Sequence, residues 1–215
     1  MMRAHYLSAL EAVRHNLVEM GETTLLLLTE ALQALTDPNP GRSARASELE
    51  AQTDHQHRLI HDQCLNLITL QSPVARDARL LTGTLEAIVD LELIGDYAYE
   101  ISVQVSSLQG RPPSQILNQI SEIGARIRTI LAAAVESWRT GEREQALVAR
   151  PQGVALRAEC GTAMEKISQL MSAPGMGMTY VNLLMVCGHL ERILRHAVCL
   201  AEQAAASAPV ASTVN

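Results

Sequence analysis

The sequence contains few aromatic residues. Aromatics make up 2% of the chain and phenylalanine is absent. Because strands are enriched in aromatic residues, this composition argues against a β-rich core. Only 12 glycines and 8 prolines interrupt the 215 residues, of which 47% are hydrophobic. Long stretches of Leu, Ala, Ile and Val between so few breaks favour helices. We therefore predict an all-α fold.

The sequence lacks the patterns of a membrane-spanning, a nucleic-acid-binding and a secreted protein. No apolar run reaches the roughly 18 residues of a membrane span, so we expect no span and leave peripheral contact open. The net charge is −6 and the arginines are scattered singly, which argues against a nucleic-acid partner. Charged residues interrupt the first 17 positions, where a signal peptide needs an apolar region, so we expect a cytoplasmic protein.

The chemistry of catalysis is also missing from the sequence. There is no serine or cysteine nucleophile motif beside a histidine, no GxxxxGK phosphate loop and no dinucleotide fingerprint. The four cysteines lie far apart without CxxC spacing, so we interpret them as reduced thiols. We predict that the protein is not an enzyme.

Hydrophobic residues recur every three or four positions along six stretches, which predicts six helices. These cover about residues 4–36, 43–71, 74–105, 114–140, 142–172 and 178–206. The strongest linker, Gln109-Gly110-Arg111-Pro112-Pro113, divides the chain. We predict a three-helix unit at 1–108, a linker at 109–113, a second three-helix unit at 114–206 and a frayed tail at 207–215.

The second unit repeats the first. The segment from His189 to Ala197 falls where the segment from Asp90 to Ala98 stands in the first unit, and Glu191 follows Glu92 by 99 residues. The same order of three helices, together with this offset, indicates an internal duplication.

The third helix carries acids on an unexpected face. By helical angle, Asp77, Glu92 and Asp96 lie among Leu81, Leu85, Ile88 and Gly95, which form the apolar face. A buried carboxylate needs a partner, because an isolated buried charge costs several kcal/mol. The Glu92 and Asp96 pair, one turn apart, therefore predicts a bound cation, and Asp77 is equally consistent with a ligand or a structural acid.

At this stretch the sequence resembles a known family. The segment Gln71-Ser72-Pro73-Val74-Ala75-Arg76-Asp77-Ala78-Arg79, followed by Asp90-Leu91-Glu92-Leu93-Ile94-Gly95-Asp96, is similar to the signature of the PhoU family, regulators of bacterial phosphate uptake. The resemblance implies two tandem three-helix bundles and iron, zinc or other ions at Glu/Asp-xxx-Asp motifs. It also implies negative regulation of phosphate uptake through the ATPase subunit of the phosphate ABC transporter and a sensor histidine kinase. We further expect a homodimer.

An all-oxygen site suits hard or intermediate ions such as Mg, Ca, Mn or Fe. In the second unit the motif reads Glu191-Arg192-Ile193-Leu194-Arg195, so a cation replaces the second acid. Glu191 keeps the position of a metal ligand. Either Arg195 holds Glu191 in place of an ion, or Arg195 extends to solvent and this unit has lost its site.

Other polar residues have competing interpretations. His55, His57 and His61 are consistent with a transition-metal site, but a solvated helix face explains them better. Arg79, Glu86 and Asp90 form an outward face that either contacts a partner or is simply solvated. The alternative functions are a carboxylate-bridged metal oxidase or storage bundle, disfavoured because Glu-x-x-His does not occur around Glu92, and a metal-free interaction scaffold.

Overall fold

The computed structural model describes residues 2–37, 39–110, 112–171 and 177–207, and in these ranges it contains helices and no strands. The long helices are α1 (Met2–Ala34), α2 (Pro40–Gln71), α3 (Arg76–Ser106), α4 (Ser114–Thr140), α6 (Ala149–Leu170) and α7 (Gly177–Ser207), and α5 (Glu144–Leu147) is a single turn. The predicted all-α fold is confirmed. The predicted break at 173–177 and the predicted tail lie almost entirely outside the described residues.

Local sequence explains where the helices begin and end. Asn39 caps α2 by accepting a hydrogen bond from the Gly41 backbone N–H at 2.9 Å, and Pro40 occupies the first helical position. Gly141 ends α4 in the left-handed region at φ 78° and donates to the Ser137 carbonyl. These ends agree with the predicted boundaries to within a few residues.

One predicted helix is interrupted in the structure. The sequence predicts a single helix over 142–172, but the structure has the short α5, a turn at Val148 and then α6. Pro151 explains the break, because proline has no N–H to donate to the carbonyl of Leu147 and its ring would clash with that carbonyl. Proline is tolerated in the first turn of α6, where such donors have no helical partner.

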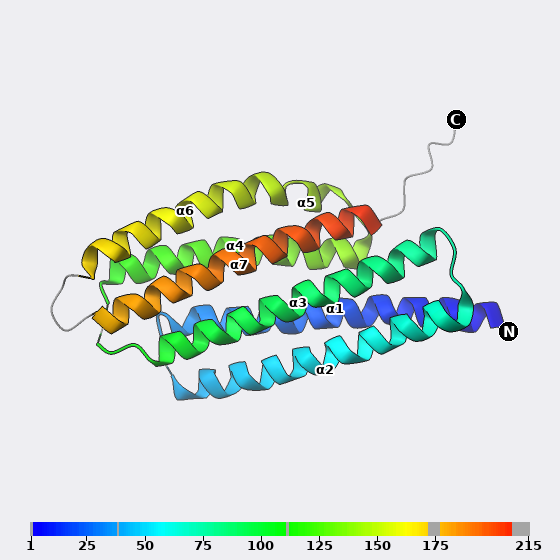
Figure 1. Ribbon diagram of the computed structural model, residues 1–215, viewed down its shortest axis with the longest axis horizontal. Helices are drawn as coiled ribbons and strands as arrows, with labels where there is room; N and C mark the ends of the chain where they lie inside the picture. The colour runs from blue at the N-terminus through cyan, green and yellow to red at the C-terminus, as the bar shows by residue number, and fades with distance from the viewer. Residues whose placement is uncertain (1, 38, 111, 172–176, 208–215) are drawn as a thin grey trace.

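The helices form two three-helix halves that lie against each other (Figure 1). Helices α1, α2 and α3 contact one another, as do α4, α6 and α7, and the halves meet through α3 against α7 and α1 against α4. Among the described residues α2 has no packing contact with the second half. Figure 1 accordingly shows α2 and α6 at opposite outer edges.

The core is built mostly of aliphatic side chains, with Trp138 and Tyr180 as its buried aromatic residues. It is one continuous cluster through both halves. Its largest fully buried side chains include Leu17, Met20, Leu27, Leu28, Leu81, Ile88, Leu91, Ile94 and Ile120. Small residues let the central helices approach, since a Cβ atom at Gly21 of α1 would lie 2.6 Å from Val135 of α4. No described helix has the length and apolar character that crossing a bilayer demands.

A polar cluster lies in the contact between α3 and α7. Asp90 is 9% exposed, its Oδ1 lies 2.7 Å from His196 Nδ1, and its Oδ2 accepts a hydrogen bond from Gln203 at 2.8 Å. The Tyr97 ring stacks with His189 and His196 at centroid distances of 5.8 and 6.0 Å. The prediction that Asp90 belongs to an outward face is wrong, because α7 covers this side of α3.

We expect Asp90→Ala to lower the free energy of unfolding by about 1–3 kcal/mol, since it leaves half-buried donors on His196 and Gln203 without an acceptor. Glu86→Ala is a matched control: Glu86 is another acid of α3, one turn away but exposed, and its loss should change the unfolding free energy by less than about 0.5 kcal/mol. Urea denaturation of both variants measures the difference. Equal stabilities would contradict a structural role for Asp90.

Candidate metal centre

Three carboxylates meet where α2 packs against α3. Glu50 and Asp54 of α2 and Asp96 of α3 each offer an oxygen, and these oxygens all lie within 4.8 Å of one another. Glu50 and Asp54 are half-buried and Asp96 is exposed. Three acids at this separation form a site that could hold a cation.

Burial and mutual repulsion raise the pKa of two of these acids. Burial raises the pKa of Glu50, and the nearby Asp54 and Asp96 raise it further. Desolvation likewise raises the pKa of Asp96, with added contributions from Glu92, Asp54 and Glu100. Both shifts mean that the charged forms lack compensation. Within the described chain the one cation at ion-pair distance from the three acids is Arg58, 3.9 Å from Asp54.

A histidine stands beside this cluster. His57 Nδ1 lies 3.4 Å from Glu92 Oε1, and both side chains are partly shielded from solvent. Glu50, Asp54 and His57 are spaced i, i+4 and i+7, so they share one face of α2. The interpretation of His57 as part of a merely solvated face overlooked this contact, while His55 and His61 are exposed as expected.

The donor set suits a metal ion. Carboxylate oxygens are hard ligands that match Mg²⁺, Mn²⁺ or iron, and an imidazole nearby adds a ligand that iron and zinc accept. Glu50, Asp54 and Asp96 would hold the ion, and Glu92 with His57 would stand next to it. A cation here would offset the desolvation and the repulsion that raise the pKa of Glu50 and of Asp96.

The predicted location of Glu92 and Asp96 is partly wrong. They lie at the edge of the contact between α2 and α3 rather than inside the core, with Glu92 half-buried and Asp96 exposed. Three helices, α1, α2 and α7, cover α3, so its buried arc is wide. The two acids fall at the margin of this arc, and helical angle alone does not separate the margin from the core. Glu92 and Asp96 do lie next to each other and to α2.

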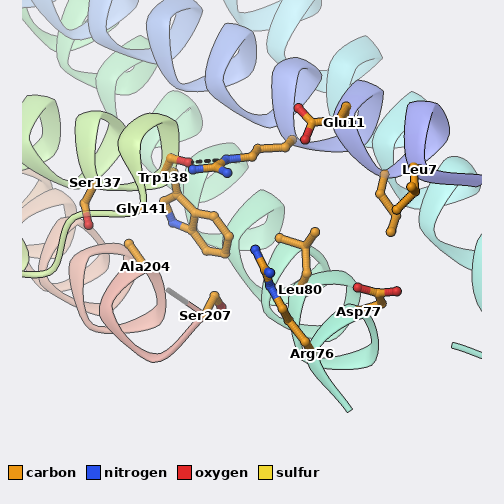
Figure 2. A pocket seen from close by; sticks show the side chains of 12 residues that line it. Leu7, Glu11, Arg76, Asp77, Leu80, Ser137, Trp138, Gly141, Ala204 and Ser207 are labelled. Carbon is orange, nitrogen blue, oxygen red and sulfur yellow. Dashed lines mark hydrogen bonds between the residues drawn. The ribbon is translucent and has the colours of Figure 1, made fainter. Parts of the chain in front are cut away.

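Asp77 does not join this cluster. On one helix it lies 15 residues before Glu92, or about 22 Å at the usual rise per residue. Its Oδ2 accepts a hydrogen bond from the Tyr6 hydroxyl at 3.1 Å. Figure 2 shows it at a separate cavity of about 340 Å³, near Arg76 and Leu7. The structure therefore supports the structural alternative for Asp77.

Glu191 in the second half is held by an arginine, but not by the predicted one. Arg157 of α6 donates from Nε to Glu191 at 2.7 Å. Arg195 is exposed, and its nearest polar contact is His196 Nε2 at 3.4 Å. The idea of Arg195 as the cation that replaces an ion is thus wrong in its residue, because the partner comes from the neighbouring helix rather than from the same one.

The sequence analysis missed Glu50 and Asp54. The signal was present, since Glu50-Ala-Gln-Thr-Asp54 has the same spacing as Glu92-Leu-Ile-Gly-Asp96. Helix α2 is polar around much of its circumference, which hid the acids that face α3. Of the predicted outward-facing residues, Arg79 and Glu86 are exposed, whereas Asp90 is buried.

The fold and the carboxylate cluster define an all-α protein of two similar three-helix halves with a group of acids between α2 and α3 of the first. Residues 17–105 match the PhoU domain family model. The chain is similar to PhoU proteins in sequence and in fold.

Two relatives are each described as "Phosphate-specific transport system accessory protein PhoU homolog". The one from Pseudomonas aeruginosa is 26% identical, and the match covers 90% of this chain and 81% of that protein. The one from Synechocystis is 24% identical, and the match covers 94% of this chain and 90% of that protein. The crystal structure of PhoU from Pseudomonas aeruginosa has a TM-score of 0.88 and 25% identity, covering 93% of this chain and 96% of that one. PhoU from Streptococcus pneumoniae shares the fold at 18% identity with a TM-score of 0.86.

The raised pKa of Asp96 predicts how pH affects the metal-free protein. Between the ordinary carboxyl pKa of about 3.9 and the raised value, the folded state binds more protons than the unfolded state, so stability falls as pH rises through this window. Asp96→Asn should therefore be more stable than the wild type above the window in chelator, and the difference should vanish below it. Melting curves recorded from pH 3 to 8 test this.

Asp62→Asn is the matched control, because Asp62 is an acid of α2 whose side chain is 77% exposed and lies outside the cluster. It should leave the difference from wild type small at every pH. If Asp62→Asn stabilises as much as Asp96→Asn, net charge rather than crowding in the cluster is the cause.

Proposed function

We propose that this protein is an accessory regulator of phosphate transport that acts by binding rather than by catalysis. The observation that supports this most directly is the similarity to PhoU accessory proteins along nearly the whole chain rather than over one motif. The match of both halves to a PhoU crystal structure agrees with it. The regulation we propose is negative: the protein lowers phosphate uptake and the phosphate-starvation response when phosphate is plentiful.

We also propose that the protein binds a metal ion at the carboxylate cluster between α2 and α3. The support is the convergence of Glu50, Asp54 and Asp96 within 4.8 Å and the raised pKa values of two of them. The ion is Mn²⁺, Mg²⁺, Zn²⁺ or iron. A carboxylate-bridged oxidase or storage bundle is disfavoured, because no Glu-x-x-His segment occurs anywhere in the chain.

The proposed partners are the ATPase subunit of the phosphate ABC transporter, a membrane sensor histidine kinase and a second copy of the chain. Arg79 and Glu86 are suitable contact residues on α3, because both are exposed and their i, i+7 spacing puts them on one side of the helix. Their opposite charges would favour a partner surface that also carries both signs. The chain itself would then work in the cytoplasm.

The metal proposal predicts ligand-dependent stability. Adding Mn²⁺, Zn²⁺ or Fe²⁺ to chelated protein should raise the melting temperature, by an amount equivalent to about 2.7 kcal/mol at one hundred times the dissociation constant. Asp54→Asn combined with Asp96→Asn should abolish the rise, and elemental analysis should show the loss of bound metal.

Glu48→Gln combined with Asp62→Asn is the control for that experiment. Both acids lie on α2, are well exposed and stand outside the cluster. The control should keep the full metal-dependent rise. A wild-type protein that binds none of these ions would leave the metal-free scaffold as the better description of this chain.

The regulatory proposal predicts that deleting the gene raises transcripts of phosphate-uptake genes in phosphate-rich medium. The wild-type gene supplied in trans should restore low expression. Arg79→Glu combined with Glu86→Arg should fail to restore it while the protein accumulates normally, if this face contacts a partner. Unchanged transcripts in the deletion strain would contradict the function itself, independently of the metal result.

A further inference from the structure

The groove between α6 and α7 corresponds, residue by residue, to the place where α2 and α3 gather the acidic cluster. Glu50, Asp54 and His57 are followed 100 residues later by Arg150, Val154 and Arg157. Glu92 and Asp96 are followed 99 residues later by Glu191 and Arg195. The acids of the cluster thus become two arginines and a valine.

Packing supports this register. In the first half a Cβ atom at Gly95 of α3 would lie 3.3 Å from Thr53 of α2. In the second half, Gly153 of α6 stands at the position of Thr53, and Leu194 of α7 stands at the position of Gly95. A Cβ atom at Gly153 would lie 2.8 Å from Val198 and 3.9 Å from Leu194. The glycine is on the third helix in the first half and on α6 in the second, but in both halves it lets the same two positions come close together. The α2–α3 and α6–α7 contacts are therefore equivalent.

The α6–α7 groove is a cavity whose lining carries an excess of positive charge. It has a volume of about 500 Å³, and its charged lining consists of Arg150, Arg157, Arg192 and Arg195 against Glu191 and Glu202. Two of these arginines are paired, Arg150 with Glu202 at 2.6 Å and Arg157 with Glu191 at 2.7 Å. Four cations against two anions leave an excess charge of +2, on a chain whose net charge is −6.

The unbalanced charge belongs to Arg192 and Arg195. Arg195 is exposed and has no carboxylate within ion-pair distance among the described residues. Arg192 is also exposed, and its guanidinium lies 5.4 Å from the centre of the Tyr97 ring, an interaction that leaves its N–H donors available. The two ion pairs hold the guanidinium groups of Arg150 and Arg157 at the rim of the groove.

The rest of the lining is apolar. Val154 is 71% exposed, and Leu194 and Val198 continue the same wall. A volume of about 500 Å³ falls in the range of small-molecule sites and is larger than an inorganic ion needs. Guanidinium groups match the geometry of phosphoryl oxygens, and a phosphate monoester carries close to two negative charges at neutral pH.

We propose that the α6–α7 groove binds an organic phosphate monoester, with its phosphoryl group on Arg195 and the neighbouring arginines and its carbon skeleton against Val154 and Val198. The ligand is either a free small molecule or the headgroup of a phosphomonoester lipid. This site lies in the opposite half from the metal centre and does not depend on it.

Calorimetric titration of chelated full-length protein with phenyl phosphate tests the proposal, with phenyl sulfate and inorganic phosphate as matched ligands. We expect one saturable site that prefers the phenyl phosphate dianion to the phenyl sulfate monoanion by about tenfold or more and weakens with added salt. Inorganic phosphate should bind less tightly than phenyl phosphate, because it makes no contact with the apolar wall.

Arg195→Gln should weaken phenyl phosphate binding about tenfold, and Arg195→Lys should weaken it less, because lysine keeps the charge but loses the planar fork. Arg79→Gln is the control, since Arg79 is an exposed arginine of α3 outside the groove. Both arginines are exposed, so circular dichroism should show wild-type folding for all three variants.

Sedimentation with vesicles separates the two sources of the ligand. Recruitment to phosphatidic acid vesicles but not to phosphatidylcholine vesicles, lost in Arg195→Gln and kept in Arg79→Gln, identifies a lipid headgroup. Saturable phenyl phosphate binding without recruitment identifies a free monoester. The proposal is overturned if neither probe binds, or if Arg79→Gln weakens binding as much as Arg195→Gln does.

Discussion

The packing of α3 against α7 is the contact on which the rest of the structure depends. These are the third helices of the two halves, and each is covered on one side by the other. Asp90 supplies the polar part of this contact by accepting from Gln203 and pairing with His196. A buried acid with two partners permits one arrangement of the helices and penalises others, because any slip would leave donors or the carboxylate unsatisfied.

The same contact decides which surfaces remain open. Since α3 and α7 occupy each other's inner faces, α2 and α6 can pack only on the outside, at opposite edges (Figure 1). Each therefore packs against the third helix of its own half. The two contacts are equivalent by duplication, but one gathers Glu50, Asp54 and Asp96 whereas the other gathers Arg150, Arg157 and Arg195. The two halves thus carry clusters of opposite charge at equivalent places.

The position of His189 shows how the halves have diverged within the interface as well. It stands where Asp90 stands in the first half, but its ring nitrogens have no hydrogen-bond partner among the described residues, and the ring stacks on Tyr97. Burial lowers its pKa, and Arg192 lowers it further. A neutral ring in the second half thus replaces the hydrogen-bonded acid of the first.

The sequence by itself determined the helical class, the positions of the long helices, the duplication and the family resemblance, because these depend on periodicity, composition and motifs that are local in the chain. It also singled out Glu92 and Asp96. It did not reveal that Glu50 and Asp54 meet Asp96, that Arg157 rather than Arg195 holds Glu191, or that Asp90 is buried. Those facts were decided by tertiary structure, because each depends on which face of one helix a second helix covers, and helical angle within a single helix does not contain that information.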